Sequence, residues 1–190
     1  GEYLPLMVIS AVLLMVAIIV TRFSAYNYQD AVFSFFGAFY IGFLLSYAMA
    51  LNIVEDAFVL VVLALCLTWA SDIGGYMFGR LWGKNKLAPQ LSPNKTWEGA
   101  IGGVILPALV GVIYIALVPT SISIGWAALL GAAMGITAEV GDLFVSAMKR
   151  YFMVKDTGNI IPGHGGVLDR FDSFILVIPV FFYCITYLTR

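Results

Sequence analysis

The sequence predicts an all-α, polytopic integral membrane protein, a helix bundle with about six transmembrane helices in this chain. Its 190 residues are 62% hydrophobic and only 11% charged, whereas soluble domains carry about 25% charged residues. Six apolar runs are long enough to cross a bilayer, which takes roughly 20 residues of helix. The Lys and Arg residues are also distributed unevenly between the connections, as the positive-inside rule leads one to expect.

The spans follow one another along the whole chain. We predict them at residues 4–21, 31–51, 57–78, 99–118, 122–147 and 173–189. If the sides alternate, the connections at 22–30, 79–98 and 148–172 share one face and hold nine of the ten Lys and Arg residues. That face is therefore predicted to be cytoplasmic. A net charge of -1 gives no indication of nucleic acid, and we expect none as a partner.

Polar content divides the chain into two predicted parts. Residues 1–56 form N-terminal transmembrane helices, and residues 57–190 form a catalytic transmembrane domain with cytoplasmic loops at 79–98 and 148–172. The chain begins Gly1-Glu2-Tyr3 without an initiator Met, so we expect further spans upstream.

The fifth span carries polar residues on one helical face. Glu139, Asp142, Ser146 and Lys149 stand at i, i+3, i+7 and i+10, which brings two carboxylates, a hydroxyl and an ammonium together. Charged side chains within a span are costly and indicate function. Carboxylates one turn apart repel unless a cation lies between them, and such oxygen ligands suit Mg²⁺. The alternative is a structural pairing of Glu139 and Asp142 with Lys149 or with bases on other helices.

The connection between the third and fourth spans is also flanked by polar residues. Asp72 lies about two turns before it, at membrane depth, as a nucleotide or metal-shell contact or as a partner of Arg80. Ser92-Pro93-Asn94 predicts a turn, after which Thr96 can cap the fourth helix. Lys95 at that helix N-terminus would suit a phosphate. The alternative makes Lys95 a positive-inside anchor.

The connection at 148–172 concentrates the remaining chemistry. It holds Lys149-Arg150, Lys155, the single histidine in Gly163-His164-Gly165-Gly166, and Asp169-Arg170-Phe171-Asp172. Glycines beside His164 would let the backbone pass close to a phosphate. Each group has a structural alternative: a turn hydrogen bond for the histidine, a topology anchor for the basic pair, and a favourable helix-dipole interaction for the aspartates. We interpret the cluster as a site for a phosphorylated substrate.

Three motifs resemble those of phosphatidate cytidylyltransferases, the CDP-diacylglycerol synthase family. The most specific block reads Ser146-x-Met148-Lys149-Arg150, then Lys155-Asp156-x-Gly158, then Pro162-Gly163-His164-Gly165-Gly166-x-x-Asp169-Arg170-x-Asp172. The others are Trp69-Ala70-Ser71-Asp72 and the stretch at 92–99, so the resemblance runs from about Trp69 to the C-terminus. Family members commonly have Glu at the position of Val145, so we expect no carboxylate role there. Members also usually have further N-terminal spans.

This resemblance implies transfer of CMP from CTP to phosphatidate, which gives CDP-diacylglycerol and pyrophosphate in phospholipid biosynthesis. It implies Mg²⁺, as one or two ions, with ligands drawn from Asp142, Asp169, Asp172 and Glu139. Phosphates are expected to bind Lys95, Lys149, Arg150, Lys155 and Arg170, the nucleotide loop to contain His164, Gly165 and Gly166, and further substrate contacts to come from Asp72, Ser92, Asn94, Thr96 and Ser146. A homodimer among membrane lipids is also implied. We expect a bacterial inner membrane, with the active site facing the cytoplasm.

Other functions remain open on the residues alone. A cation-coupled transporter would explain Glu139, Asp142 and Asp72, but transporter sites lie near the midplane, often between inverted repeats, and no repeat is visible. A polyprenol-type lipid kinase is a second alternative. A CDP-alcohol phosphatidyltransferase is a third, although its DGxxAR…GxxxDxxxD pattern is absent.

Overall fold

The helical fold class is confirmed. The computed structural model describes residues 28–120, 122–158 and 166–188, together with scattered positions between residues 10 and 21. The elements run α2 (Tyr28–Ala50), the short 3-10 helix η1 (Leu51–Ile53), α3 (Ala57–Trp82), β1 (Lys86–Ala88), β2 (Ser92–Thr96), α4 (Trp97–Leu117), α5 (Ile124–Tyr151) and α6 (Leu168–Leu188). Within the described residues, five helices are long and apolar enough to cross a membrane. The predicted first span, at 4–21, lies largely outside the described residues.

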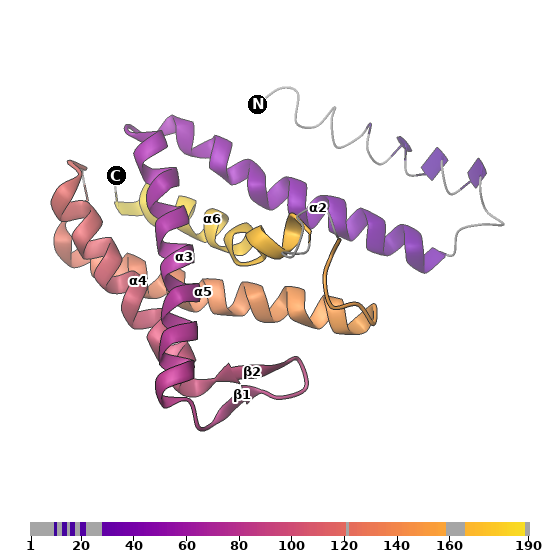
Figure 1. Ribbon diagram of the computed structural model, residues 1–190. Helices are drawn as coiled ribbons and strands as arrows, with labels where there is room; N and C mark the ends of the chain where they lie inside the picture. The colour runs from indigo at the N-terminus through magenta and orange to yellow at the C-terminus, as the bar shows by residue number, and fades with distance from the viewer. Residues whose placement is uncertain are drawn as a thin grey trace. The chain divides into compact units, whose positions relative to one another are not determined.

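The chain divides into two compact units, Gly1–Leu44 and Leu45–Arg190. The division falls inside α2, so the second unit contains the end of that helix and all later elements (Figure 1). The predicted boundary between residues 56 and 57 stays a prediction.

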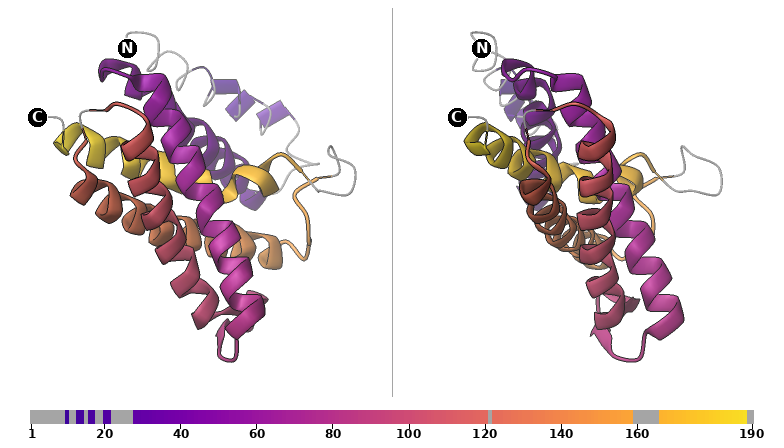
Figure 2. Two further views of the ribbon diagram at one scale, coloured as in Figure 1. Left: turned by 60° about the vertical axis from the view of Figure 1, so that its left-hand side comes forward. Right: turned by 90° about the vertical axis from the view of Figure 1, so that its left-hand side faces the viewer.

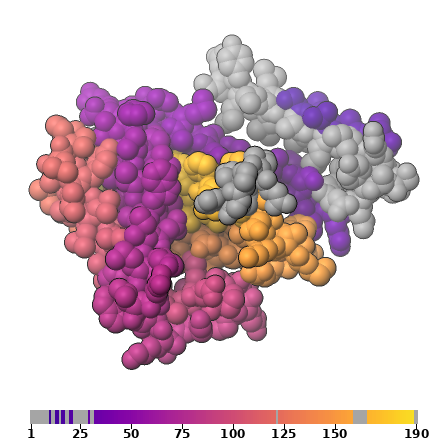
Figure 3. All heavy atoms as spheres, viewed as in Figure 1, coloured from indigo at the N-terminus to yellow at the C-terminus, as the bar shows by residue number. Residues whose placement is uncertain are grey.

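A small antiparallel hairpin between α3 and α4 departs from the predicted pattern. Lys86 pairs with Thr96, and Ala88 pairs with Ser92. The segment at 92–94, which we predicted as a turn, therefore lies in β2, and the turn occupies residues 89–91. A two-stranded ribbon leaves each strand one unpaired edge, so a proline without an N–H is tolerated there. The hairpin lies beside the end of α3 (Figure 3).

Helices α3 and α5 extend beyond the spans that hydropathy predicts. They contain 26 and 28 residues, or about 39 and 42 Å of helix, whereas the hydrocarbon core is about 30 Å thick. Hydropathy marks only the part of a helix that lies in lipid, because backbone hydrogen bonds continue the helix into water. The two helices end at Trp82 and Tyr151, which places their last turns next to the polar connections.

The apolar core of the second unit lies between α3, α5 and α6. Its fully buried members include Leu63 and Leu67 of α3, Met134 of α5, and Ile178 and Phe181 of α6. The named positions are four residues apart on α3 and three apart on α6, so each of these helices turns one apolar stripe inward.

Helices α3 and α4 lie side by side and meet at the hairpin (Figure 2). A β-carbon on Gly74 of α3 would overlap the backbone carbonyl of Gly102 on α4. Small residues of this kind let membrane helices approach closely. The Tyr114 hydroxyl, near the end of α4, also donates to the Val59 carbonyl, near the start of α3, at 2.9 Å. This bond joins the two helices at the end away from the hairpin. The α3–α4 pair therefore forms a firm support for the hairpin.

Candidate active site

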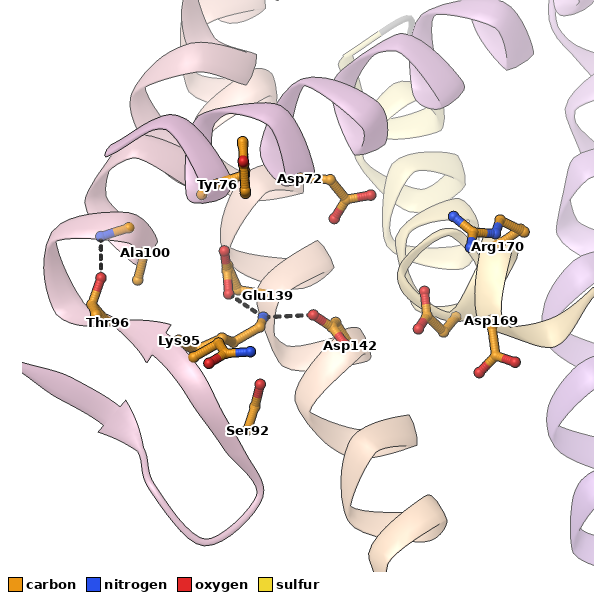
Figure 4. A pocket seen from close by; sticks show the side chains of 14 residues that line it. Asp72, Tyr76, Ser92, Lys95, Thr96, Ala100, Glu139, Asp142, Asp169 and Arg170 are labelled. Atoms are coloured by element: carbon orange, nitrogen blue, oxygen red, sulfur yellow. Dashed lines mark hydrogen bonds and ion pairs between the residues drawn. The ribbon is translucent and has the colours of Figure 1, made fainter. Parts of the chain in front are cut away.

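A polar cavity of about 440 Å³ lies where the hairpin meets the helices. Its walls come from five elements: Asp72, Gly75 and Tyr76 of α3, Ser92, Asn94, Lys95 and Thr96 of β2, Gly99 and Ala100 of α4, Glu139 and Asp142 of α5, and Asp169, Arg170 and Asp172 of α6. Figure 4 shows side chains from the hairpin, α3, α5 and α6 converging on this space. The structure therefore brings together most of the residues that the sequence singles out, although they are spread over 101 positions, from 72 to 172.

Lys95 occupies the centre of the acidic residues on α5. Its Nζ lies 2.5 Å from Glu139 Oε2 and 2.8 Å from Asp142 Oδ2, and the side chain is 19% exposed (Figure 4). The predicted repulsion between these two carboxylates is therefore relieved by an ammonium from the hairpin. Burial of the ammonium alone would lower the pKa of Lys95, but the Asp142 and Glu139 carboxylates outweigh this effect and raise the pKa above its ordinary value of 10.5. Lys95 is thus a cation throughout the neutral range.

Glu139 fits into a slot between α3 and α4. β-carbons on Gly75 and Gly103 would lie only 3.1 and 2.7 Å from Glu139 Oε1. The glycines of the two helices therefore leave room for a carboxylate that would otherwise be excluded from the interface.

The start of α4 is built as predicted. Thr96 is the N-cap of the helix, and its hydroxyl accepts a hydrogen bond from the Gly99 N–H at 3.1 Å. The neighbouring Glu98 accepts hydrogen bonds from the backbone N–H groups of Lys84 and Asn85, at 3.1 and 3.3 Å. The cap orients β2 relative to α4, and Glu98 secures the entry of the hairpin, so that Lys95 is directed at α5.

Of the other two residues predicted on this face of α5, Ser146 contacts Asp142 and Lys149 contacts α6. Asp142 Oδ1 accepts a hydrogen bond from the Ser146 hydroxyl at 3.3 Å, which confirms that these residues share a helical face. Lys149, three residues further along, does not pair with the α5 carboxylates. Its Nζ donates to Asp169 Oδ1 on α6 at 3.0 Å.

Asp169 accepts further hydrogen bonds through its other carboxylate oxygen. Oδ2 accepts from the Thr157 N–H at 2.8 Å, from the Thr157 hydroxyl at 2.9 Å, and from the Gly166 N–H at 2.9 Å. The Asp169 side chain is only 7% exposed. Asp172, one turn later on α6, accepts a hydrogen bond from its neighbour Ser173 at 2.8 Å.

Several predicted site residues within the described part of the chain do not line the cavity. They are Ser146, Lys149, Arg150, Lys155 and Gly166. Arg150 Nε donates to the Leu91 carbonyl at 3.3 Å and so holds the tip of the hairpin. His164 and Gly165 lie outside the described residues. Val145, at the position where the family commonly has Glu, is 1% exposed and forms part of the packing.

The structure also adds residues that the sequence reasoning missed. Tyr76 lines the cavity and accepts a hydrogen bond at 2.6 Å from Arg80, which we had considered as a partner of Asp72. Its spacing of four residues from Asp72 places both on one helical face and could have indicated this. Thr157 stands at a variable position of its motif, and no signal in the sequence marks it.

The donor set fits a magnesium ion bound together with a nucleotide. Five carboxylates and two cationic side chains line the cavity, so an anionic nucleotide needs additional positive charge to enter. Among the described residues, no three His, Cys, Asp or Glu side chains are grouped so as to hold a metal ion by themselves. Mg²⁺ typically takes one or two carboxylates and completes its shell with water and substrate phosphates. The carboxylates therefore suit an ion that arrives with, or is completed by, phosphate oxygens.

Known proteins are similar to this chain in sequence over most of its length. Residues 2–188 match the model of the Cytidylyltransferase family. A phosphatidate cytidylyltransferase from Staphylococcus haemolyticus is 41% identical over 155 residues, which cover 82% of this chain and 59% of the relative. One from Bacillus subtilis is 36% identical over 174 residues, which cover 91% of this chain and 65% of the relative.

The chain thus spans about three fifths of the length of the curated relatives that it matches. The comparisons give no support to a transporter, a lipid kinase or a phosphatidyltransferase. Because the family match extends over nearly the whole chain, this integral membrane protein belongs to the cytidylyltransferase family.

Proposed function

We propose that this protein transfers CMP from CTP to phosphatidate, giving CDP-diacylglycerol and pyrophosphate. The observation that carries the proposal is the polar cavity, which is built mainly on helices that are long and apolar enough to span a membrane. Such a cavity lets a water-soluble nucleotide meet a phosphate that stays attached to its lipid. The names of the similar proteins and the three motifs support the same reaction.

The position of the cavity along the helices suits a lipid headgroup. Asp72 lies ten residues before the end of α3 at Trp82, or about 15 Å along the axis. α3 is about 9 Å longer than the hydrocarbon core, so with this excess at the Trp82 end Asp72 would lie about 6 Å below the boundary between lipid and water. The hairpin and the connection from α5 to α6 belong to the connections that carry most of the Lys and Arg residues, which are expected on the cytoplasmic side. We therefore propose that the active site faces the cytoplasm at a bacterial inner membrane.

The proposed reaction needs charge neutralisation more than proton transfer. A phosphate oxygen of phosphatidate forms the new bond to the α-phosphorus of CTP. The bond from that phosphorus to the bridging oxygen breaks, and pyrophosphate leaves with the electron pair. The phosphate monoester is already anionic near neutral pH, so positioning and electrostatic stabilisation are expected to dominate.

The residues in the cavity suggest a division of roles. Asp142 and Asp172 would hold Mg²⁺, with Glu139 near them, and the ion would supply positive charge to the phosphates of both substrates. Lys95 and Arg170 are the cationic side chains of the described lining, and they would bind substrate phosphates. Lys95 is itself the cation between the Glu139 and Asp142 carboxylates. Ser92, Asn94, Thr96 and Asp72 would contribute polar contacts to the nucleotide.

The proposal is tested by following labelled CMP from CTP into lipid, with the protein reconstituted in vesicles that contain phosphatidate and Mg²⁺. We expect CDP-diacylglycerol and one pyrophosphate per turnover. Asp142→Asn should lower kcat by about a hundredfold or more, whereas Glu55→Gln, in the exposed loop before α3, should match the wild type. Absence of product from the folded wild-type protein, or unchanged turnover in Asp142→Asn, would contradict the proposal.

We extend the proposal to assembly as a homodimer in contact with membrane lipids, which the family resemblance implies. Mass measurement of the protein in lipid nanodiscs should give twice the mass of the chain. A monomer that is fully active would contradict this part alone.

A further inference from the structure

The carboxylate of Asp169 is the most heavily hydrogen-bonded acidic group among the described residues of the cavity. Four donors from three places in the chain contact it: the Lys149 ammonium, the Thr157 N–H, the Thr157 hydroxyl and the Gly166 N–H. We refer to these four hydrogen bonds as the Asp169 clasp. A carboxylate has about four lone-pair sites, and the clasp directs three donors to Oδ2 and one, the Lys149 ammonium, to Oδ1.

The clasp joins segments that would otherwise be separate. Lys149 lies in the last turn of α5, Asp169 in the first turn of α6, and Thr157 and Gly166 stand at the two described ends of the connection between these helices. The two ends also touch directly, because a β-carbon on Gly166 would lie 2.6 Å from the Thr157 hydroxyl and 2.9 Å from the Gly158 nitrogen. Gly166 is therefore required for the close approach that the clasp stabilises.

The other carboxylates of the cavity are engaged differently. Glu139 and Asp142 share a side-chain donor, the ammonium of Lys95 from the hairpin. Such a donor can be withdrawn as one unit when another cation arrives. Two of the Asp169 donors are backbone N–H groups, which cannot leave without moving the chain. With its own side chain 7% exposed, Asp169 would lose two fixed backbone donors if it turned to a metal.

We propose that Asp169 is a positioning residue that holds Thr157, Gly166 and Lys149 together beside the cavity, and that it is not a metal ligand. The kinetic part of this inference rests on the proposed CMP transfer, but the clasp itself does not. Asp142 and Asp172 then remain as the carboxylates for the metal. The same aspartate that the sequence suggests as a ligand acts through Thr157, Gly166 and Lys149.

The first experiment compares Asp169→Asn with Asp142→Asn in two measurements that require neither substrate. Hydrogen–deuterium exchange of peptides that contain Thr157 and Gly166 should accelerate about tenfold or more in Asp169→Asn, because a charged acceptor is lost, and should stay at the wild-type rate in Asp142→Asn. Mn²⁺ affinity, followed by electron paramagnetic resonance, should fall by more than about tenfold in Asp142→Asn but by less than about threefold in Asp169→Asn.

Thr157 supplies a milder variant that leaves Asp169 in place. Thr157→Val removes the hydroxyl donor and should accelerate exchange at Gly166 by a smaller factor, while Thr157→Ser should restore the wild-type rate. In the CMP-transfer assay, Thr157→Val and Asp169→Asn should raise KM for CTP while kcat changes little, since the wall of the cavity is displaced. Asp142→Asn should instead lower kcat.

Unchanged exchange in Asp169→Asn would overturn the inference, and so would a loss of Mn²⁺ affinity as large as that in Asp142→Asn. Failure of the proposed function has a different signature. A wild-type protein that binds no Mn²⁺ or transfers no CMP would contradict that function, and the exchange data would still decide whether the clasp exists.

Discussion

Lys95→Met tests the central electrostatic feature of the cavity. The substitution removes the ammonium between Glu139 and Asp142 and keeps a side chain of similar length and apolar volume. Two carboxylates on adjacent turns of α5 would then face each other without a compensating charge. We expect the folded state to be destabilised in metal-free buffer and rescued by divalent cations.

The size of the effect follows from the exposure of the three groups. Removing one partner of a fully buried ion pair costs about 3–5 kcal/mol, whereas exposed pairs contribute roughly 0–1 kcal/mol. The side chains of Lys95, Glu139 and Asp142 are 19%, 15% and 30% exposed, so solvent screens them in part and we expect about 2 kcal/mol. For a chain of this length, that corresponds to a fall in Tm of about 4–8 °C.

Thermal unfolding in detergent with EDTA, followed by a thiol-reactive dye, measures this change. Mg²⁺ should raise the Tm of Lys95→Met more than that of the wild type, because the ion takes the place of the ammonium. Adding Glu139→Gln to Lys95→Met should recover about half of the loss, since the repulsion is removed. A Tm within about 1 °C of the wild type in EDTA would refute the reasoning, because it would mean that solvent screens the pair almost completely.

Three further predictions concern Lys95 and the helix contacts that support the hairpin. The pKa of Lys95 in the folded state lies above 10.5, so the stability that its charge contributes is complete below that value and is lost only as pH rises through the raised pKa. The Tm difference between wild type and Lys95→Met should therefore be equal at about pH 7 and about pH 9. A difference that shrinks over this range would contradict the raised pKa. Gly74→Val should prevent folding to a monodisperse species in size-exclusion chromatography, because its β-carbon overlaps the Gly102 carbonyl, whereas Gly125→Ala, with no atom within 4 Å, should behave like the wild type. Thr96→Ala should lower Tm by about 2–4 °C through loss of the helix cap and Thr96→Ser should not; equal Tm values for the two variants would show that the cap contributes nothing.

The sequence alone was sufficient for properties that depend on composition or on neighbours along one helix. The apolar runs predict membrane-spanning helices because lipid requires about 20 nonpolar residues for each crossing. The predicted Thr96 cap is confirmed by the hydrogen bond from the Gly99 N–H. It could be predicted because the two residues are only three positions apart. Asp142 and Ser146 share a face for the same reason, as one helical turn separates them.

Contacts between distant segments could be recognised only in the tertiary structure. Spacing places Lys149 on the face that carries Asp142, yet Lys149 reaches across to Asp169 on α6. The cation at Glu139 is Lys95, which is 44 residues away in sequence and arrives on a hairpin that hydropathy does not mark. Helical periodicity determines which side of a helix a residue occupies, but the partner on that side depends on how the helices pack.

The two aspartates at the start of α6 show the same limit. The sequence by itself determined that Asp169 and Asp172 lie within one turn of a helix in a cytidylyltransferase motif, and it suggested one role for both. Only the tertiary structure decided that Thr157 and Gly166, which stand on either side of the intervening chain, both donate to the carboxylate of Asp169. The physical reason is that hydrogen-bond satisfaction of a buried carboxylate depends on where the backbone donors of the connecting chain lie, which no local spacing specifies.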